Sequence, residues 1–245
     1  MTIDNIINPN VRIDDSLVLD YFKYQFDNCD IFRRYVELLG VKVSSAADIP
    51  FLPIRFFKTG KVYSSNREPE TVFTSSGTTG TEVSRHFVAD ASIYKLSYTA
   101  GFRYFFGDIS GYAVPALLPS YLERQGSSLI AMVRGLMEDS GNSLSGFFLN
   151  NHDELFDTLQ ILKNNKVPTL LFGVSFALLD FLEKFNIDFP ELMVMETGGM
   201  KGRREEITRD ELHEIICSGF GVDRVFSEYG MTELLSQAYS KGKGI

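Results

Sequence analysis

A run of hydroxyl-bearing residues and glycines has the composition of an anion-binding loop. It reads Phe73-Thr74-Ser75-Ser76-Gly77-Thr78-Thr79-Gly80-Thr81. The glycines let the backbone turn tightly, and successive backbone N–H groups with neighbouring hydroxyls can bind phosphate oxygens. The glycine spacing fits neither a Walker A loop nor a dinucleotide fingerprint. A hairpin loop or a flexible linker would have the same composition, so this run leaves the choice open.

A second segment, Tyr229-Gly230-Met231-Thr232-Glu233, combines an aromatic ring, a hydroxyl and a carboxylate directly after a predicted strand. Tyr229 could stack on a base, and Thr232 could bind a phosphate. Glu233 could hold Mg²⁺ through a carboxylate oxygen. The alternative is a surface loop in which Thr232 caps the N-terminus of a short helix.

A third segment, Thr197-Gly198-Gly199-Met200-Lys201-Gly202, also follows a predicted strand. Paired glycines there would allow the backbone to approach a flat ligand closely, although an ordinary strand-to-helix loop is an equal alternative. The adjacent Arg203-Arg204-Glu205-Glu206 is predicted to be a solvated charged turn.

The elements that must position these segments alternate between strand and helix patterns from about residue 70 onward. This alternation predicts an α/β fold, with a mostly parallel, doubly wound sheet covered by helices on both faces. Ligands of such sheets bind beyond the carboxyl ends of the strands, where the second and third segments fall. The predicted strands are 70–74, 86–88, 113–118, 146–149, 169–172, 192–196 and 223–226; the predicted helices are 90–102, 127–137, 153–164, 175–185 and 208–218.

The first 60 residues have a different pattern. Helical spacing of apolar residues predicts helices over 16–27 and 31–39, and Gly40 is suited to end the second of them. The prolines in 49–54 predict an extended connector. We therefore predict an N-terminal helical segment and connector over 1–60 and an α/β core over 61–245.

Composition and charge limit the classes of function. The 245 residues carry a net charge of −8, which argues against nucleic acid or an anionic membrane surface as the partner. The N-terminus shows no secretory signal and no apolar run is long enough to span a membrane. Cys217 lies at an apolar helical position beside Ile215 and Ile216 and is predicted to be a core cysteine, and the same is predicted for Cys29. Neither cysteine belongs to a metal-type pattern, and a disulfide framework is not expected. A reducing cytoplasm is the expected location.

The glycine-rich run and the Tyr229–Glu233 segment resemble the two signature motifs of the adenylate-forming superfamily, which includes acyl- and aryl-CoA synthetases. Gly198-Gly199-Met200-Lys201, Phe172-Gly173-Val174-Ser175-Phe176 and the compact length most resemble one branch. That branch is the acyl-protein synthetase (LuxE-type) family, with phenylacetate–CoA ligases next. The resemblance covers roughly residues 50–240.

The resemblance implies ATP-dependent activation of a carboxylic acid, expected to be a fatty acid, to an acyl-adenylate. Acyl transfer to a thiol of a protein or of CoA follows, and an acyl reductase is a candidate partner. Thr232 and Glu233 would be the catalytic residues: Thr232 would contact the α-phosphate and Glu233 would bind Mg²⁺. Phe176 could line the acyl pocket. The ATP-binding residues would be Ser75, Ser76, Gly77, Thr78, Thr79, Gly80 and Thr81 around the phosphates, and Gly198, Gly199, Met200, Tyr229, Gly230 and Met231 around the adenosine.

Two departures from the superfamily pattern leave an alternative open. Glu82-Val83-Ser84-Arg85 follows the loop where many members have a lysine, and Arg85 could supply only the charge. The sequence given ends at Ile245, so the mobile C-terminal lid with its catalytic lysine is expected to be absent. The alternatives are a lid-deficient or non-catalytic module that binds nucleotide or acyl-adenylate, or an aryl- or acyl-CoA ligase. His86 is predicted to pack at the loop base, and His152 and His213 at a helix start and a helix surface.

Overall fold

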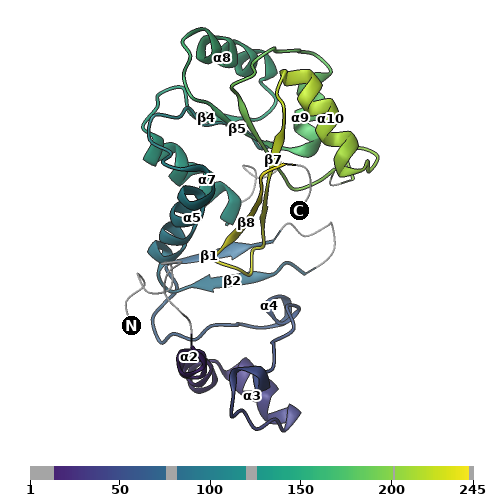
Figure 1. Ribbon diagram of the computed structural model, residues 1–245. Helices are drawn as coiled ribbons and strands as arrows, with labels where there is room; N and C mark the ends of the chain where they lie inside the picture. The colour runs from purple at the N-terminus through teal and green to yellow at the C-terminus, as the bar shows by residue number, and fades with distance from the viewer. Residues whose placement is uncertain (1–13, 76–81, 120–125, 201, 243–245) are drawn as a thin grey trace. The chain divides into compact units, whose positions relative to one another are not determined.

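The computed structural model describes residues 14–75, 82–119, 126–200 and 202–242, and it has an α/β architecture (Figure 1). Its contacts divide the chain into two compact units. The first unit contains Met1–Ala100, Gly126–Ser128 and Met231–Leu235, and the second contains Gly101–Gln125, Leu129–Gly230 and Ser236–Ile245. The division at residue 60 into a helical segment and a core stays a prediction.

The first unit begins with two helices that agree with the sequence prediction. Helix α2 spans Asp15–Asn28, and α3 spans Asp30–Leu39. The carboxylate of Asp14 caps α2 by accepting a hydrogen bond from the backbone N–H of Leu17 (3.0 Å). Gly40 ends α3 with a φ of 65°, which glycine adopts without steric cost. A small core holds the helices together, formed by Cys29, Phe32 and Val36 with Phe22, Phe26, Ile31, Leu52 and Val62.

The connector contains short elements that the sequence did not predict. A 3₁₀ turn, η1, spans Ala46–Asp48, and the helix α4 spans Phe56–Thr59 directly after the predicted extended stretch. Strands β1 (Thr71–Thr74) and β2 (Arg85–Val88) then form an antiparallel pair, in which Thr74 lies opposite Arg85. The glycine-rich run therefore connects two antiparallel strands. Helix α5 (Ala91–Phe106) follows, and the chain enters the second unit within it.

The second unit is built on a six-stranded sheet with the strand order β4-β3-β5-β6-β7-β8. Strands β3 to β7 are parallel, as predicted, and only β8 runs antiparallel. The sequence analysis missed β8. The strand bounds are Pro115–Leu117 (β3), Gly146–Phe148 (β4), Leu170–Val174 (β5), Met193–Thr197 (β6), Val225–Gly230 (β7) and Gln237–Ser240 (β8).

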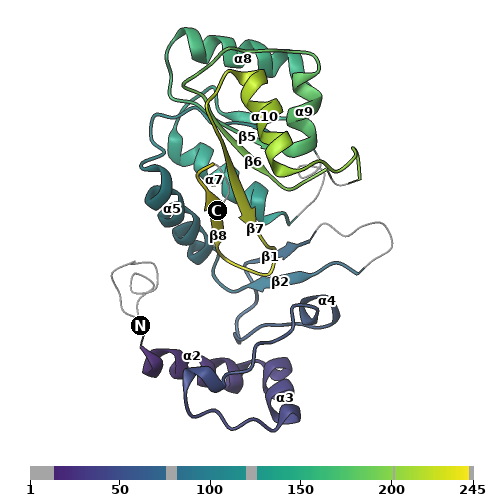
Figure 2. The ribbon, with the colours of Figure 1, turned by 45° about the vertical axis from the view of Figure 1, so that its right-hand side comes forward.

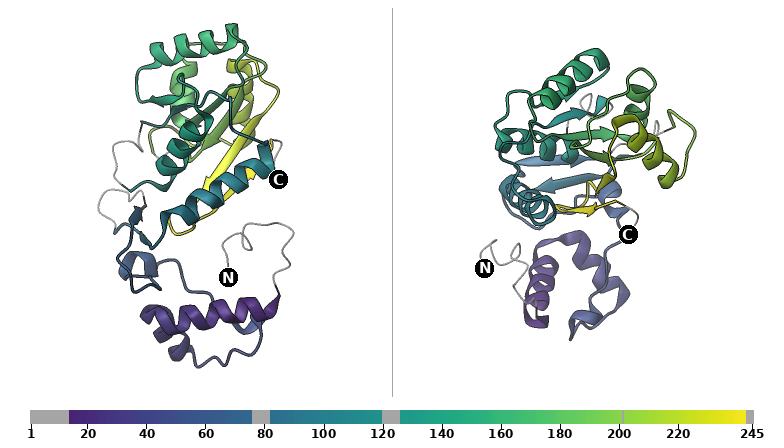
Figure 3. Two further views of the ribbon diagram at one scale, coloured as in Figure 1. Left: turned by 90° about the vertical axis from the view of Figure 1, so that its left-hand side faces the viewer. Right: turned by 45° about the horizontal axis from the view of Figure 1, so that its top comes forward.

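Helices cover both faces of this sheet, which confirms the doubly covered arrangement. They are α7 (Ser128–Ser140), α8 (His152–Asn164), α9 (Ser175–Leu182) and α10 (Arg209–Phe220). Figure 2 shows α7 and the end of α5 on one face, with α9 and α10 on the other. The two further views in Figure 3 show the same layers. Rings from α9 and α10 stack in the core, where the Phe181 and Phe220 centroids are 5.8 Å apart.

The strand order fixes where a ligand is expected. The chain moves outward from β3 to β4 and then returns past β3 to β5, so the sheet changes winding direction between β3 and β5. Open α/β sheets bind ligands beyond the carboxyl ends of their strands near such a point. Helices long and apolar enough to cross a membrane are not found among the described residues.

Candidate functional site

Polar side chains are buried at the carboxyl ends of β5, β6 and β7. Glu196 and Thr197 end β6, Ser175 follows β5 as the first residue of α9, and Ser227 and Glu228 lie in β7. Each of these residues is at most 7% exposed. Buried polar groups at this depth need partners, and the partners differ between the two faces of the sheet.

On the face covered by α9 and α10, Glu196 lies among donors. The Ser175 hydroxyl donates a hydrogen bond to Glu196 Oε2 (3.1 Å). Arg209 Nη2 and His213 Nε2 from α10 both lie 3.8 Å from Glu196 Oε1. The buried His213 Nε2 has no hydrogen-bond partner among the described residues. The prediction that His213 lies on the helix surface is wrong: its side chain is only 14% exposed, because this turn of α10 faces the sheet.

On the opposite face, Glu228 has a single hydroxyl partner within the described structure. The Thr197 hydroxyl donates to Glu228 Oε2 at 2.6 Å. Burial raises the pKa of the Glu228 carboxyl from 4.5 to about 7; the Thr197 hydrogen bond opposes this shift, and the nearby charge of Glu196 adds to it. The Glu228 carboxyl group therefore keeps its proton at pH values where an exposed glutamate has already lost it.

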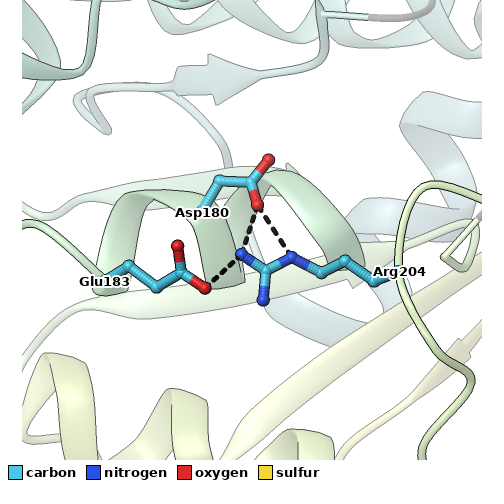
Figure 4. A network of polar contacts seen from close by, with 3 residues as sticks. All are labelled: Asp180, Glu183 and Arg204. Atoms are coloured by element: carbon cyan, nitrogen blue, oxygen red, sulfur yellow. Dashed lines mark hydrogen bonds and ion pairs between the residues drawn. The ribbon is translucent and has the colours of Figure 1, made fainter.

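The segment after β6 is fixed to α9 by two arginines. The guanidinium of Arg203 lies 4.9 Å from the centre of the Phe176 ring, within cation–π distance. Arg204 Nε donates to Asp180 Oδ1 (2.7 Å) and its Nη2 donates to Asp180 and Glu183 (Figure 4). Burial alone would lower the pKa of Arg204, but these hydrogen bonds outweigh it and raise the pKa. The prediction of a solvated turn is therefore wrong for Arg204, because its half-buried side chain bridges two carboxylates.

These anchors position the glycine pair at the end of β6. Gly198 has a φ of 79°, which only glycine adopts readily. Met200, predicted to flank an adenine ring, is 3% exposed. Phe176, proposed for an acyl pocket, is 1% exposed and lies in the core.

The Tyr229–Glu233 segment is half strand and half turn. Strand β7 extends four residues beyond the predicted end at Phe226, so Tyr229 and Gly230 pair with Ala238 and Gln237 of β8. The Tyr229 side chain is 63% exposed, as a stacking ring would need to be. The chain after Gly230 belongs to the first unit. There a hydrogen bond from the Leu234 N–H to the Met231 carbonyl (3.0 Å) closes a turn. Thr232 thus lies in a turn and does not cap a helix.

The first unit brings the base of the glycine-rich run next to this turn. The Ser75 N–H donates to the Ser84 carbonyl (3.1 Å), and the Ser84 N–H donates to the Ser75 hydroxyl (2.9 Å). Two residues after Ser84, in β2, His86 Nδ1 lies 2.9 Å from the Thr232 carbonyl oxygen. Because a carbonyl oxygen only accepts, Nδ1 carries the proton. His86 therefore packs at the loop base, as predicted.

Burial lowers the pKa of His86, although the Thr232 hydrogen bond and the charge of Glu233 oppose the shift. The imidazole is therefore neutral at neutral pH. Its ring also contacts Phe57 edge-to-face, with centroids 5.5 Å apart. His86 consequently acts as a rigid, uncharged support for the Thr232 turn.

The predicted site residues therefore fall into three groups. Ser75, Met231, Thr232 and Glu233 belong to the first unit, and Gly198, Gly199, Met200, Tyr229 and Gly230 belong to the second, at or just after the carboxyl ends of β6 and β7. The remaining six, Ser76, Gly77, Thr78, Thr79, Gly80 and Thr81, lie outside the described residues. The sequence analysis missed Glu196 and placed His213 on the surface. Ser175, Thr197 and Glu228 lie in or directly beside the segments that it singled out, but it gave these three residues no role. The signal for Glu196 and Glu228 was a carboxylate near the end of an otherwise apolar strand.

The two cysteines differ in burial. Cys29 is fully buried, as predicted, whereas Cys217 is only partly buried. Burial and the charge of Asp223 raise the pKa of the Cys217 thiol. A raised pKa leaves little thiolate at neutral pH, and so makes this thiol a poor nucleophile.

A resident metal cluster is not found in the part of the chain that the structure describes, since no three His, Cys, Asp or Glu side chains converge. Mg²⁺ does not need such a cluster when it binds with a nucleotide, because one or two carboxylates complement the phosphate oxygens. The single carboxylate of Glu233, beside neutral His86 and in the same unit as Ser75, fits that requirement.

The fold and these sites define an α/β protein with polar, glycine-containing segments at the carboxyl edge of a mostly parallel sheet. No family model matches the chain. Over 72 residues, 28% of the chain, the sequence is 38% identical to the long-chain-fatty-acid–luciferin-component ligase of Photorhabdus luminescens. The match covers 62% of that protein, which is less than two thirds of its length.

Proposed function

We propose that this protein activates a carboxylic acid, in the first instance a long-chain fatty acid, by ATP-dependent adenylation and then transfers the acyl group to a thiol. The partial relative is named as a ligase of a long-chain fatty acid, which supports activation and transfer of an acyl group in general. The resemblance of two sequence motifs to those of adenylate-forming enzymes supports ATP as the activating reagent. This assignment places the chain with the acyl-protein synthetases.

The observation that carries the proposal is the contact between His86 and Thr232. These residues are 146 positions apart, and the 2.9 Å hydrogen bond holds the turn of the second motif against the strand that follows the glycine-rich run. A phosphate-binding loop and an α-phosphate ligand must be neighbours if they act on one triphosphate. A chance pair of loops has no reason to meet in this way.

In the proposed reaction, a carboxylate oxygen of the acid attacks the α-phosphorus of ATP. The new O–P bond forms as the bond between the α-phosphorus and the bridging oxygen breaks, and pyrophosphate leaves. A thiolate then attacks the acyl carbonyl carbon, and AMP leaves with the oxygen it shared with the acyl group. Both steps depend on alignment of the reacting atoms and on neutralisation of charge on the leaving group.

Each motif has a defined task in this reaction. The run from Ser75 to Thr81 would bind the β- and γ-phosphates through N–H and hydroxyl groups. Thr232 would hold the α-phosphate in line with the acid, and Tyr229 would stack on the adenine beside Gly198 and Gly199. Glu233 would hold Mg²⁺, which neutralises phosphate charge when bound.

Carboxylate-dependent ATP–pyrophosphate exchange tests the proposal, with acids ranging from acetate to long-chain fatty acids and phenylacetate. We expect exchange with one class of acid. Thr232→Ala and Glu233→Gln should each reduce exchange at least tenfold, roughly the loss expected for a transition-state hydrogen bond or charge. Exposed residues of the same unit offer matched controls, Thr59→Ala and Glu68→Gln, which should retain full exchange.

The outcomes separate the alternatives. Full exchange by folded Thr232→Ala would remove Thr232 from the site. Tight Mg·ATP binding without exchange for any acid would identify a nucleotide-binding module in place of an enzyme. Acid-dependent exchange followed by acyl transfer to CoA alone would favour a CoA ligase over an acyl-protein synthetase.

A further inference from the structure

Glu228 lies where the two candidate nucleotide-binding segments of the second unit meet. Thr197 and Glu228 are paired across the parallel strands β6 and β7, and they are the last residues before Gly198 and Tyr229. The 2.6 Å hydrogen bond from the Thr197 hydroxyl to Glu228 Oε2 joins the strand ends. Gly198 and Tyr229 therefore each follow one member of this hydrogen-bonded pair, so the Thr197–Glu228 hydrogen bond connects the starts of the two segments.

The second oxygen of the same carboxyl group lies against Gly230. A Cβ atom at position 230 would be only 2.8 Å from Glu228 Oε1, closer than real Cβ contacts allow. Residues 228 and 230 alternate onto the same face of the strand. A side chain at position 230 would therefore push the Glu228 carboxyl group out of its present position, where it contacts both segments.

The groups around Glu228 offer little compensation for a negative charge on its carboxyl group. Across the antiparallel pair of β7 and β8, its direct neighbour is Tyr239, whose ring packs on Phe105 and Phe106 of α5. From the opposite face of the sheet, the charge of Glu196 on β6 raises the pKa of Glu228 further, and the ammonium of Lys241 lies over the Phe105 ring. Within the described structure, no cation pairs with the Glu228 carboxylate.

We propose that Glu228 is a positioning residue that, in its neutral form, holds the ends of β6 and β7 in the arrangement that binds the nucleotide. The Thr197 hydroxyl can donate to either form, but only the neutral carboxyl group lies against Gly230 without an uncompensated buried charge. Ionisation adds a second buried negative charge to that of Glu196, which lies on the opposite face of the sheet. A charge of this kind draws water to the strand ends, and it also opposes an anionic ligand.

The inference rests on the proposed function, because it assigns a regulation by pH to the nucleotide site. The expected change in ATP affinity with pH follows from the fraction of the protein in which Glu228 is neutral. The apparent dissociation constant rises in inverse proportion to that fraction. With a pKa of about 7 for Glu228, the neutral fraction falls roughly tenfold between about pH 6 and pH 8, so ATP binding should weaken about tenfold.

The experiment measures Mg·ATP binding by calorimetry at both pH values for the wild type, Glu228→Gln and Glu228→Ala. Glutamine cannot ionise but retains the shape and the acceptor for Thr197. We expect Glu228→Gln to bind equally at the two pH values after correction for ATP itself, which is common to all variants. Glu228→Ala should bind weakly at both, so that only the conservative variant rescues affinity. In exchange assays the change should appear in the KM for ATP and leave kcat nearly constant.

A measurement without nucleotide accompanies these assays. The infrared band of a protonated carboxyl group should be present at about pH 6 in the wild type, absent in Glu228→Gln, and should disappear as the pH passes about 7. Equal pH dependence of ATP binding in wild type and Glu228→Gln overturns the inference and leaves the proposed function intact. Absence of ATP binding by the folded wild type at every pH overturns the proposed function, and the inference with it.

Discussion

Replacing Glu228 by glutamine measures how much ionisation of this buried carboxyl group lowers the free energy of unfolding. The pKa of Glu228 is raised to about 7 in the folded protein from 4.5, mainly by burial. In the unfolded chain the group titrates near its ordinary value. Between these two pH values, the folded protein therefore holds a proton that the unfolded chain has released. Stability from Glu228 is fully present below about pH 4.5 and is lost as the pH rises through about 7.

The size of this effect follows from the two pKa values. A difference between 4.5 and about 7 corresponds to about 3 kcal/mol of unfolding free energy, because each pKa unit is worth 1.36 kcal/mol. The Glu228 side chain is 6% exposed, so solvent screening removes little of this value. Glutamine keeps the volume and the acceptor for the Thr197 hydroxyl but carries no charge at any pH. We expect Glu228→Gln to match the wild type at about pH 4 and to exceed its stability by about 3 kcal/mol at about pH 8.5.

Urea unfolding followed by circular dichroism at closely spaced pH values measures this difference directly. Glu191→Gln serves as the control, because Glu191 is an exposed carboxylate just before β6 and should show a difference near zero throughout. A stability gain for Glu228→Gln that does not change with pH would refute the reasoning. It would mean that the native carboxyl group is already hydrated, and that glutamine acts through packing alone.

The remaining predictions concern the supports of the two candidate sites. Burial lowers the pKa of His86 from 6.5, so the stability supplied by the neutral ring falls as the pH drops below that value; His86→Gln should remove this acid-side slope in urea titrations. Gly221→Ala should lower the free energy of unfolding by about 1–2 kcal/mol in thermal melts, because φ is 67° and the new Cβ would lie 2.6 Å from Asp188 Oδ1. Arg204→Ala should cost less than about 1 kcal/mol, because its carboxylate partners are substantially exposed; it should weaken Mg·ATP binding more than it weakens the fold.

The strand and helix pattern predicted the architecture of the second unit well for a physical reason. Parallel strands covered on both faces are continuous apolar runs, such as Leu170–Val174, and such runs stand out from the amphipathic helices between them. The end of α3 was also readable, since Gly40 ends this helix in the left-handed conformation. Gly221 ends α10 in the same way but was not used, and the predicted helix ended two residues early. The four residues of β8 gave no comparable signal, because Gln237–Ser240 is a mixed edge strand paired on one side only.

The sequence predicted only those parts of the candidate site that form short runs of glycines and hydroxyl-bearing residues. Glycines and hydroxyls in short runs marked Gly198 and Thr232, but nothing in the sequence joins Thr232 to His86. That pairing depends on a contact between residues far apart in the chain, and no local periodicity encodes it. The surface prediction for His213 failed for a related reason: Leu212 and Ile216 mark the buried side of α10, and the histidine lies next to that side, where the carboxylate of Glu196 approaches.

The contrast between Glu196 and Glu228 is the strongest argument that the end of the β6–β7 pair is organised around charge. Both are buried glutamates on paired parallel strands, but alternation of side chains places them on opposite faces of the sheet. One face gives Glu196 an arginine, a histidine and a hydroxyl; the other gives Glu228 a hydroxyl alone. The charge of Glu196 adds to the burial that raises the pKa of Glu228, so the two carboxyl groups interact although they lie on opposite faces of the sheet.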